Sequence, residues 1–210
     1  YIYIHDQSAR LDTMNCCLFD VGSVLRGGFE MGNVWYNEPK TLDTAFDVMG
    51  DIILSTAAQQ YGGFTVPEVD KILAPYAQKS YNKYYEEFLK YSDPSWEGRE
   101  EKGRVYAWEK VCRDCDQGWQ GIEYKLNTVG SSRGDYPFVT VTLGLGMGRF
   151  EKMISKSLLK VHMGGQGKAG HKKPVLFPKI VFLYDEEIHG DGKECEDVFE
   201  TGVACSAKTM

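Results

Sequence analysis

Hydrophobic residues recur at intervals of three and four in several long segments of the chain, the spacing that places them on one face of an α-helix. Residues 41–60 are predicted to form such a helix, capped at its start by Thr41. Its apolar positions are Leu42, Ala45, Phe46, Met49, Ile52 and Ile53. Residues 67–91 are predicted to form a second helix that bends near Pro75. Its three central tyrosines would face a core, a partner or a nucleotide: Tyr81, Tyr84 and Tyr85.

The longest periodic segment, residues 100–128, predicts one helix with a continuous apolar seam. The seam consists of Val105, Trp108, Cys112, Cys115, Trp119, Ile122 and Leu126. Cys112 and Cys115 have the C-x-x-C spacing of a zinc or redox site, but the sequence lacks the second cysteine or histidine pair that a structural zinc site needs. Because both cysteines occupy seam positions, we expect buried thiols and no metal.

Other segments have the composition of β-strands. Residues 14–21 form a mostly apolar run, and residues 136–143 alternate and are rich in β-branched side chains. A third strand is predicted over residues 175–184, after a helix that follows the glycine-rich residues 144–148. The order strand, helices, strand, helix, strand predicts an α/β fold with βαβ-like connections, in a single domain over residues 1–210.

Composition narrows the class of protein. The chain is 42% hydrophobic and 26% charged, which is typical of a folded globular protein. Its formal net charge of −6 argues against binding nucleic acid through bulk charge, and no apolar run is long enough to span a membrane. The chain starts at Tyr1 without a secretion signal and has six cysteines. We therefore expect a cytoplasmic location, reduced thiols and a chain that is a piece of a longer protein.

The charge changes sign sharply near the end of the sequence. Residues 149–179 contain eight Lys or Arg and one Glu, whereas residues 180–200 contain eight Asp or Glu and one Lys. The basic stretch is either a solvated face or a surface that holds phosphates. Two glycine motifs beside it do not fit nucleotide-binding loops. Gly144-x-Gly146 is followed by Arg149 in place of a third glycine, and Gly167-Lys168 is followed by alanine in place of Ser or Thr.

The remaining cysteines differ in their surroundings. Cys16 and Cys17 are adjacent in a predicted strand, so their side chains point to opposite faces and only one can face a given cavity. Cys205 lies among small residues after Gly202, which predicts a tight loop. Chemistry alone assigns no role to such a loop cysteine.

A set of short motifs, however, extends over essentially the whole chain. They include His5-Asp6, Met14-Asn15-Cys16, Gly27-Gly28-Phe29, Glu38-Pro39-Lys40, Gln60-Tyr61-Gly62-Gly63, Leu73-Ala74-Pro75-Tyr76, Leu126-Asn127-Thr128, Phe177-Pro178-Lys179 and Cys205-Ser206-Ala207-Lys208. In this order the motifs resemble the anaerobic ribonucleoside-triphosphate reductases, oxygen-sensitive glycyl-radical enzymes that make deoxyribonucleotides. The resemblance implies part of a ten-stranded α/β barrel formed from two half-barrels, with a cysteine on a finger loop inside it.

The same resemblance implies a pair of catalytic cysteines. In the family, a thiyl radical on the finger-loop cysteine, which maps to Cys205, abstracts the 3′ hydrogen of the ribose, and the 2′ oxygen then leaves as water. A second cysteine on the opposite face of the ribose takes part in the reduction and maps to Cys16. Cys17 would point away from the cavity. The positions expected to contact substrate are His5, Asp6 and Asn15.

The resemblance also implies regulation by nucleotides. Residues expected to bind a deoxynucleotide or ATP effector are Glu38, Lys40 and Lys83, beside a homodimer surface formed by residues 41–60 and 67–91. The implied partners are a radical-SAM activating enzyme and a reductant, either formate or a small thiol protein. No bound metal is expected within these residues.

The chain departs from the family pattern in three respects. It lacks the Arg-x-x-Gly-Tyr motif that carries the stable glycyl radical, the cysteine-rich metal site and the ATP-binding regulatory domain. We therefore expect it to form the first part of the catalytic barrel and to be inactive alone. Two alternatives remain open at this point: a non-catalytic nucleotide-binding or dimerisation module, and another glycyl-radical enzyme related to formate lyases.

Overall fold

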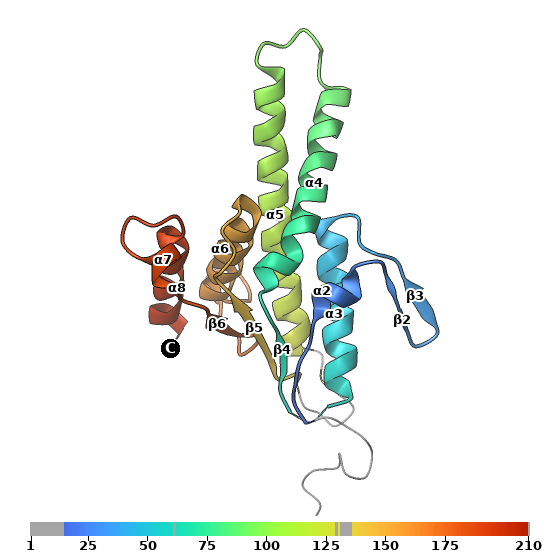
Figure 1. Cartoon of the computed structure of the whole chain (residues 1–210), viewed down its shortest axis with the longest axis vertical. Helices are drawn as coiled ribbons and strands as arrows, with labels where there is room; N and C mark the ends of the chain where they lie inside the picture. The colour runs from blue at the N-terminus through green and yellow to red at the C-terminus, as the bar shows by residue number, and fades with distance from the viewer. Residues whose placement is uncertain (1–14, 61, 129, 131–135, 210) are drawn as a thin grey trace, which may run out of the picture.

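A four-stranded parallel sheet forms the centre of the protein (Figure 1). The computed structural model describes residues 15–60, 62–128, 130 and 136–209. Within them the strands lie in the order β1 (Cys17–Leu18), β4 (Phe64–Val66), β5 (Val139–Leu143) and β6 (Lys179–Phe182). Helices lie between successive strands of the sheet, so the predicted α/β fold is confirmed. The sheet is open in the described part of the chain, and no closed barrel is seen there.

Four long helices account for most of the helical structure: α3 (Leu42–Ala58), α4 (Val69–Tyr91), α5 (Arg99–Thr128) and α6 (Arg149–Gly164). Figure 1 shows that α4 and α5 form a long hairpin that projects well beyond the sheet. The predicted helices are therefore confirmed, and α4 continues through Pro75. Neither α5, with its 30 residues, nor any other described helix is long and apolar enough to cross a membrane.

The core lies between the sheet and the helices on one of its faces. The predicted apolar positions of α3 are all buried, and the second half of the predicted α5 seam is buried as well. The prediction is wrong for Val105, which is 50% exposed. Gly103 and Ala107 are buried in its place, and Gly103 faces α4. A Cβ added at Gly103 would lie 3.0 Å from the rings of Tyr85 and Phe88.

The predicted strand over residues 14–21 is shorter than expected. Only Cys17–Leu18 pairs as β1, and helix α2 (Val21–Leu25) begins three residues later. Asp20 caps α2 by accepting a hydrogen bond from the Ser23 amide at 3.0 Å, and this N-cap ends the strand earlier than predicted. The glycine-rich residues that follow form a hairpin of β2 (Phe29–Met31) and β3 (Val34–Tyr36), which extends away from the sheet (Figure 1).

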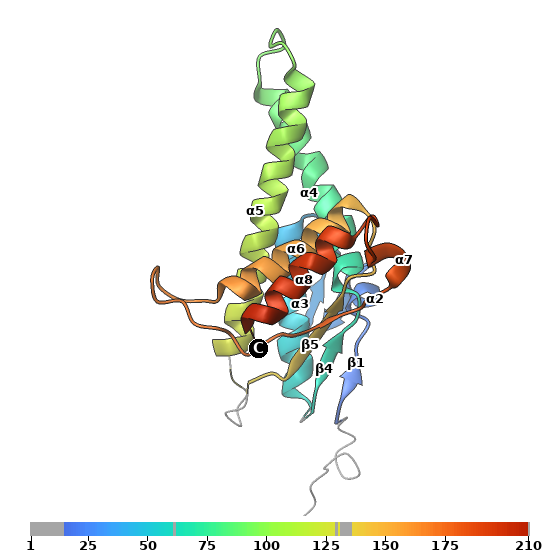
Figure 2. The ribbon, with the colours of Figure 1, turned by 90° about the vertical axis from the view of Figure 1, so that its left-hand side faces the viewer.

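The end of the chain is helical where a loop was predicted. After β6, a short helix α7 (Glu186–His189) leads into α8 (Glu196–Thr209), which packs beside α6 (Figure 2). Val198 and Cys205 are seven residues apart, two helical turns, and are both buried. Acidic residues in the first turn and Lys208 in the last turn complement the helix dipole. These helix signals outweigh the small residues that suggested a loop. The predicted strand over residues 175–184 is likewise reduced to β6.

Candidate functional site

The sheet face opposite the helices is uncovered among the described residues. Leu18, Thr65, Thr140 and Lys179 lie in register across the four strands. Alternation along each strand turns the neighbouring side chains, such as Phe64 and Val139, into the core. Leu18 is 71% exposed. One face of the sheet therefore packs into the core, and the side chains of the other face are open to a ligand or to another segment of protein.

Cys16 lies at the edge of this open face, immediately before β1, and its side chain is exposed. Its Sγ accepts a hydrogen bond from the Gly63 amide at 3.2 Å. The neighbouring Gly62 allows the close approach, because an added Cβ would lie 2.3 Å from the Asn15 carbonyl oxygen and 2.5 Å from Cys16 Sγ. Asn15 is exposed beside it. The structure thus brings together two predicted site residues, Asn15 and Cys16, against the turn before β4.

Cys17 has the opposite orientation, as the alternation predicted. It is half-buried and packs against the hydrophobic core. The side-chain amide of Gln60 donates a hydrogen bond to its Sγ at 2.9 Å. Of the two adjacent thiols, only Cys16 is available to a molecule bound on the open sheet face.

Two residues further across the sheet from Cys16 were not assigned a role from the sequence. The ring of Phe138 is the nearest group to Gly63, at 3.4 Å from an added Cβ. The ammonium of Lys179 lies 4.4 Å from the centre of that ring. Lys179 was visible only as part of a motif, because its position beside β5 depends on the pairing of strands far apart in the sequence. The open face thus offers a thiol, an aromatic ring and a cation.

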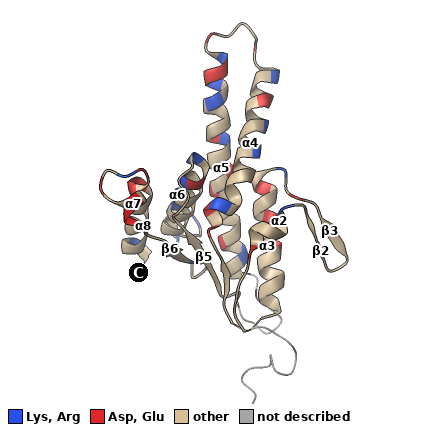
Figure 3. Ribbon diagram, viewed as in Figure 1, with Lys and Arg blue, Asp and Glu red and all other residues tan. Residues whose placement is uncertain are grey.

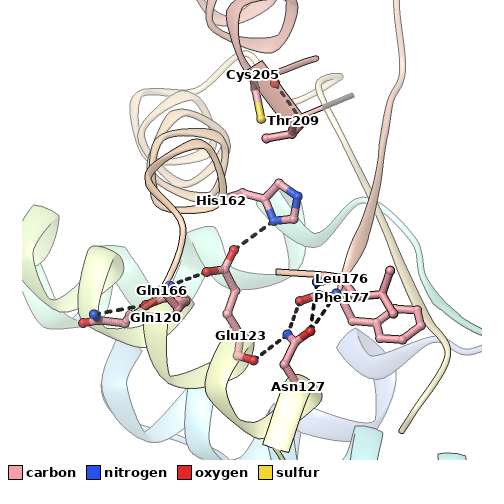
Figure 4. Close-up of polar contacts among 9 residues, drawn as sticks. All are labelled: Gln120, Glu123, Asn127, His162, Gln166, Leu176, Phe177, Cys205 and Thr209. Carbon is pink, nitrogen blue, oxygen red and sulfur yellow. Dashed lines mark hydrogen bonds and ion pairs between the residues drawn. The ribbon is translucent and has the colours of Figure 1, made fainter. Parts of the chain in front are cut away.

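Cys205 is placed differently from the prediction. It lies within α8, is 4% exposed and belongs to the core between α6 and α8. Figure 4 shows its sulfur facing His162, whose Nδ1 lies 2.9 Å from the buried carboxylate of Glu123. Burial raises the pKa of the Cys205 thiol, and the negative charge of Glu123 raises it further. In this arrangement Cys205 is a protonated, shielded thiol, and its catalytic role remains a prediction.

Glu123 organises several polar groups where α5 meets α6. Besides His162, it accepts a hydrogen bond from the side chain of Gln166 (Figure 4). One turn further on, Asn127 donates to the Phe177 carbonyl at 2.6 Å and accepts from the Phe177 amide at 3.1 Å. These contacts fix the segment that enters β6. Glu123 could not be predicted from the sequence, since a single charged residue beside an apolar seam gives no separate signal.

The predicted effector residues lie near the start of α3 and on α4. Glu38 forms an ion pair with Lys79 at 2.6 Å and accepts a hydrogen bond from the Gly27 amide at 3.1 Å. These contacts lower the pKa of the Glu38 carboxyl, the Lys79 hydrogen bond most of all. Lys83 lies four residues after Lys79, on the same face of α4, and is exposed. Lys40 is exposed beside the first turn of α3.

A cavity of about 590 Å³ lies beside the carboxyl ends of β1 and β4. Its lining includes Glu38 and Lys79 together with the cations Arg26 and Lys71. The carboxyl ends of parallel strands are a common place for ligands in open α/β sheets. Lys79 was missed in the sequence because only the fold brings it to Glu38.

The glycine motif after β5 binds an internal carboxylate. Oδ2 of the buried Asp70 accepts hydrogen bonds from the amides of Gly144 at 3.1 Å and Gly146 at 3.2 Å, and from the Ser155 hydroxyl at 3.2 Å. A Cβ added at Gly146 would lie 2.9 Å from this oxygen. The amides that would bind a phosphate in a dinucleotide fold are therefore occupied, which agrees with rejecting that motif.

The Cys112/Cys115 pair follows the seam prediction. Cys115 is fully buried in the core, and Cys112 is half-buried against it. Burial raises the pKa of both thiols. Within the residues that the structure describes, no group of three or more His, Cys, Asp or Glu side chains is arranged to hold a metal ion. His5 and Asp6 lie outside the described residues, so their predicted contact with substrate has no structural counterpart.

Comparison with known proteins agrees with the motif order. The family model described as anaerobic ribonucleoside-triphosphate reductase matches residues 1–210. The reductase of Enterobacteria phage T4 is 35% identical over all of this chain and 34% of its own length. The reductase of Escherichia coli K12 is 34% identical over all of this chain and 28% of its own length. The chain thus spans about a third of the length of these curated relatives.

Solved structures agree on the fold. The anaerobic ribonucleotide reductase from Thermotoga maritima, in complex with dATP and CTP, superposes on 98% of this chain with a TM-score of 0.64 at 15% identity. The same enzyme with dATP bound in its specificity site superposes with a TM-score of 0.66. This chain covers about a third of those chains. The match of the family model over every residue shows that the chain belongs to the anaerobic ribonucleoside-triphosphate reductase family.

Proposed function

We propose that this chain forms the first part of the catalytic barrel of an anaerobic reductase that converts ribonucleoside triphosphates to 2′-deoxyribonucleoside triphosphates. The observation that carries the proposal is the exposed thiol of Cys16 on the open face of the sheet, in a member of this family. A closed barrel requires further strands over that face, and a substrate held between them would meet Cys16 from one side.

The chemistry needs a reducing thiol at this position. After the 3′ hydrogen has been removed as an atom, the 2′ hydroxyl leaves as water and the sugar must be reduced. The Cys16 thiol supplies a hydrogen atom to the ribose, which leaves a thiyl radical on Cys16 for formate or a small thiol protein to reduce. The Gly63 amide holds the sulfur in place. Asn15 and Lys179 are proposed to contact the nucleotide from the same face, Lys179 through its positive charge.

Cys205 is proposed to carry the thiyl radical. The stable glycyl radical that would generate it belongs to a segment outside these 210 residues. A radical-SAM activating enzyme forms that glycyl radical. The electrons for the reduction come from formate or a small thiol protein. Because Cys205 is buried against α6, this role requires the segment 196–209 to adopt another conformation in the assembled barrel.

Nucleotide regulation is proposed at the carboxyl ends of β1 and β4. Glu38 and Lys79 line the cavity there. Lys40 lies two residues after Glu38, and Lys83 lies one helical turn after Lys79. The Thermotoga reductase binds dATP in a specificity site. We propose that a deoxynucleotide or ATP binds near these residues in a homodimer built on α3 and α4.

The test uses the complete reductase that contains this sequence, activated under strict anaerobiosis. In Cys205→Ser, tritium release from 3′-labelled substrate and deoxynucleotide formation should both stop, while the glycyl radical still forms. In Cys16→Ser, tritium release should continue without deoxynucleotide product. Cys17→Ser is the matched control and should retain turnover. Deoxynucleotide formation by Cys205→Ser or Cys16→Ser would contradict the roles assigned here.

A binding or dimerisation module without radical chemistry is distinguished by a second measurement. Addition of dATP should raise the melting temperature and shift sedimentation toward a dimer, and Lys83→Gln should weaken both effects. If nucleotide binding is present while the Cys16 and Cys205 variants keep wild-type properties in every assay, the module interpretation replaces the catalytic one.

A further inference from the structure

A second large cavity, of about 620 Å³, lies between α5 and α6. One stripe of α6 supplies four cations to its wall: Arg149, Lys152, Lys156 and Lys160. Their spacing of three, four and four residues places them on a single face of the helix. Figure 3 shows the positive charge along α6 and the negative charge of α7 and α8 beside it. This cavity is separate from the one that contains Glu38 and Lys79.

Arg149 is held rigidly at one end of the cavity. Its guanidinium carbon lies 4.2 Å from the centre of the Trp108 ring and 4.8 Å from that of Tyr81. Stacking on aromatic rings restrains the side chain without using its N–H groups. Within the described part of the chain, these N–H groups donate no hydrogen bond and face no carboxylate in an ion pair. The N–H groups along the edge of the Arg149 guanidinium are therefore available to a ligand.

The four cations divide into two pairs of different availability. Lys152 forms an ion pair with Glu194, just before α8, and Lys156 forms one with Asp197 in the first turn of α8. Lys160 has no such partner in the described residues. Among the described residues of the wall, the carboxylates are Asp116, which accepts a hydrogen bond from Ser157, and Asp197. The cavity thus has more positive than negative charge, and two of its cations, Arg149 and Lys160, are uncommitted.

We propose that this cavity binds a polyphosphate anion, with Arg149 and Lys160 as its principal contacts. An arginine fork matches phosphate oxygens in a bidentate geometry, and a lysine adds a compact positive charge. A volume of this size is in the range of small-molecule sites. The triphosphate of a nucleotide and a free polyphosphate share this chemistry, and the experiment distinguishes them.

Cys112 provides a reporter inside the same cavity. The thiol is half-buried in the wall, and its pKa is raised by burial and by Asp116 while Arg149 and Lys160 oppose the rise. An anion bound to those two cations would offset their effect on the thiolate and would also block access. Alkylation of Cys112 should therefore slow when the ligand binds.

The experiment measures the alkylation rate of Cys112 by mass spectrometry, at low ionic strength, against tripolyphosphate and against ATP. We expect saturable protection by tripolyphosphate, with the apparent Kd raised about tenfold in Arg149→Gln and in Lys160→Gln, since each loses one charge-assisted contact. Equal protection by ATP and tripolyphosphate assigns the site to the phosphate chain alone. Tighter binding of ATP adds a contribution from the nucleoside.

A control variant keeps the proposal falsifiable. Lys90→Gln removes an exposed cation from the far end of α4 and should not change the protection of Cys112. Absence of saturable protection at millimolar tripolyphosphate would overturn the proposal. So would equal weakening by Lys90→Gln and Arg149→Gln, because that result describes diffuse charge attraction. Lys160 is exposed, so its variant tests the site even if Arg149→Gln destabilises the fold.

Discussion

The amide nitrogen of Gly63 lies 3.2 Å from Sγ of Cys16 and holds the exposed thiol against the turn before β4. Gly62 is part of the same contact, because its missing side chain leaves room for the Asn15 backbone and the Cys16 sulfur. The position of the proposed reducing thiol therefore depends on Gly63, which lies 47 positions later in the sequence, and on its neighbour Gly62.

Substitution of Gly62 by alanine tests this dependence. The new Cβ would lie 2.3 Å from the Asn15 carbonyl oxygen, so Asn15 and Cys16 must move. We expect a loss of about 1–3 kcal/mol in the free energy of unfolding, measured with urea, together with changed alkylation kinetics at Cys16. Gly27→Ala serves as a comparison, because that glycine has no atom within 4 Å of its added Cβ and only its positive φ of 77° opposes the change. Gly27→Ala should leave Cys16 kinetics unchanged.

The six cysteines should differ strongly in reactivity. Cys16 is exposed, whereas Cys115, Cys195 and Cys205 are buried and burial raises the pKa of those three thiols. Iodoacetamide at neutral pH should therefore modify Cys16 first in the folded protein, as mapped by peptide mass spectrometry. Rapid modification of Cys205 without unfolding would show that α8 does not shield it as described.

A pair of glycines on α5 provides a test of helix packing. A Cβ at Gly118 would lie 2.1 Å from the Phe46 ring of α3, whereas nothing lies within 4 Å of one at Gly121. Gly118→Ala should cost about 1–3 kcal/mol through overpacking. Gly121→Ala should instead stabilise the protein by about 0.5–1 kcal/mol, since alanine has the higher helix propensity. Urea denaturation compares the two, and equal effects would contradict the close contact of α3 and α5.

The Asp70 carboxylate should be essential to the loop after β5. Asp70→Asn keeps the shape but removes the charge that accepts from two amides and a hydroxyl, so we expect a loss of about 1.5–3 kcal/mol. Asp191→Asn, at an exposed loop position, should change stability by less than about 0.5 kcal/mol. Comparable stability of both variants in urea would mean that other contacts hold the glycine loop.

The contacts of Glu38 should make part of the stability depend on pH. Its pKa is lowered from the usual 4.5, first by the Lys79 hydrogen bond and then by the Gly27 amide. The resulting stabilisation is present above pH 4.5 and is lost as the pH falls through the lower pKa of the folded state. The difference in melting temperature between wild type and Glu38→Gln should therefore shrink as the pH is lowered from about 6 to about 3. Glu30→Gln, on the exposed side of β2, should differ from wild type by the same small amount throughout.

The sequence by itself determined the helices, the α/β class and the family. Periodicity located α3, α4, α5 and α6 because a helix that covers a sheet must repeat its apolar residues every turn. Strict alternation in residues 139–143 located β5 for the corresponding reason. The adjacency of Cys16 and Cys17 was enough to predict that only one of the two thiols can face a given cavity, because neighbouring side chains of a strand point in opposite directions.

Tertiary structure alone decided which distant residues meet. Pairing of the strands brings Gly63 to Cys16. The packing of α4 brings Lys79 to Glu38 and Asp70 to Gly144. The local sequence around each residue does not predict these contacts. Tertiary structure also decided the exposure of Val105, which has a seam position but lies where α5 extends beyond the sheet and the other helices. Cys205 was misjudged because small residues suit both a loop and a helix, and burial against α6 favours the helix. Long-range packing supplies free energy that local propensity does not contain.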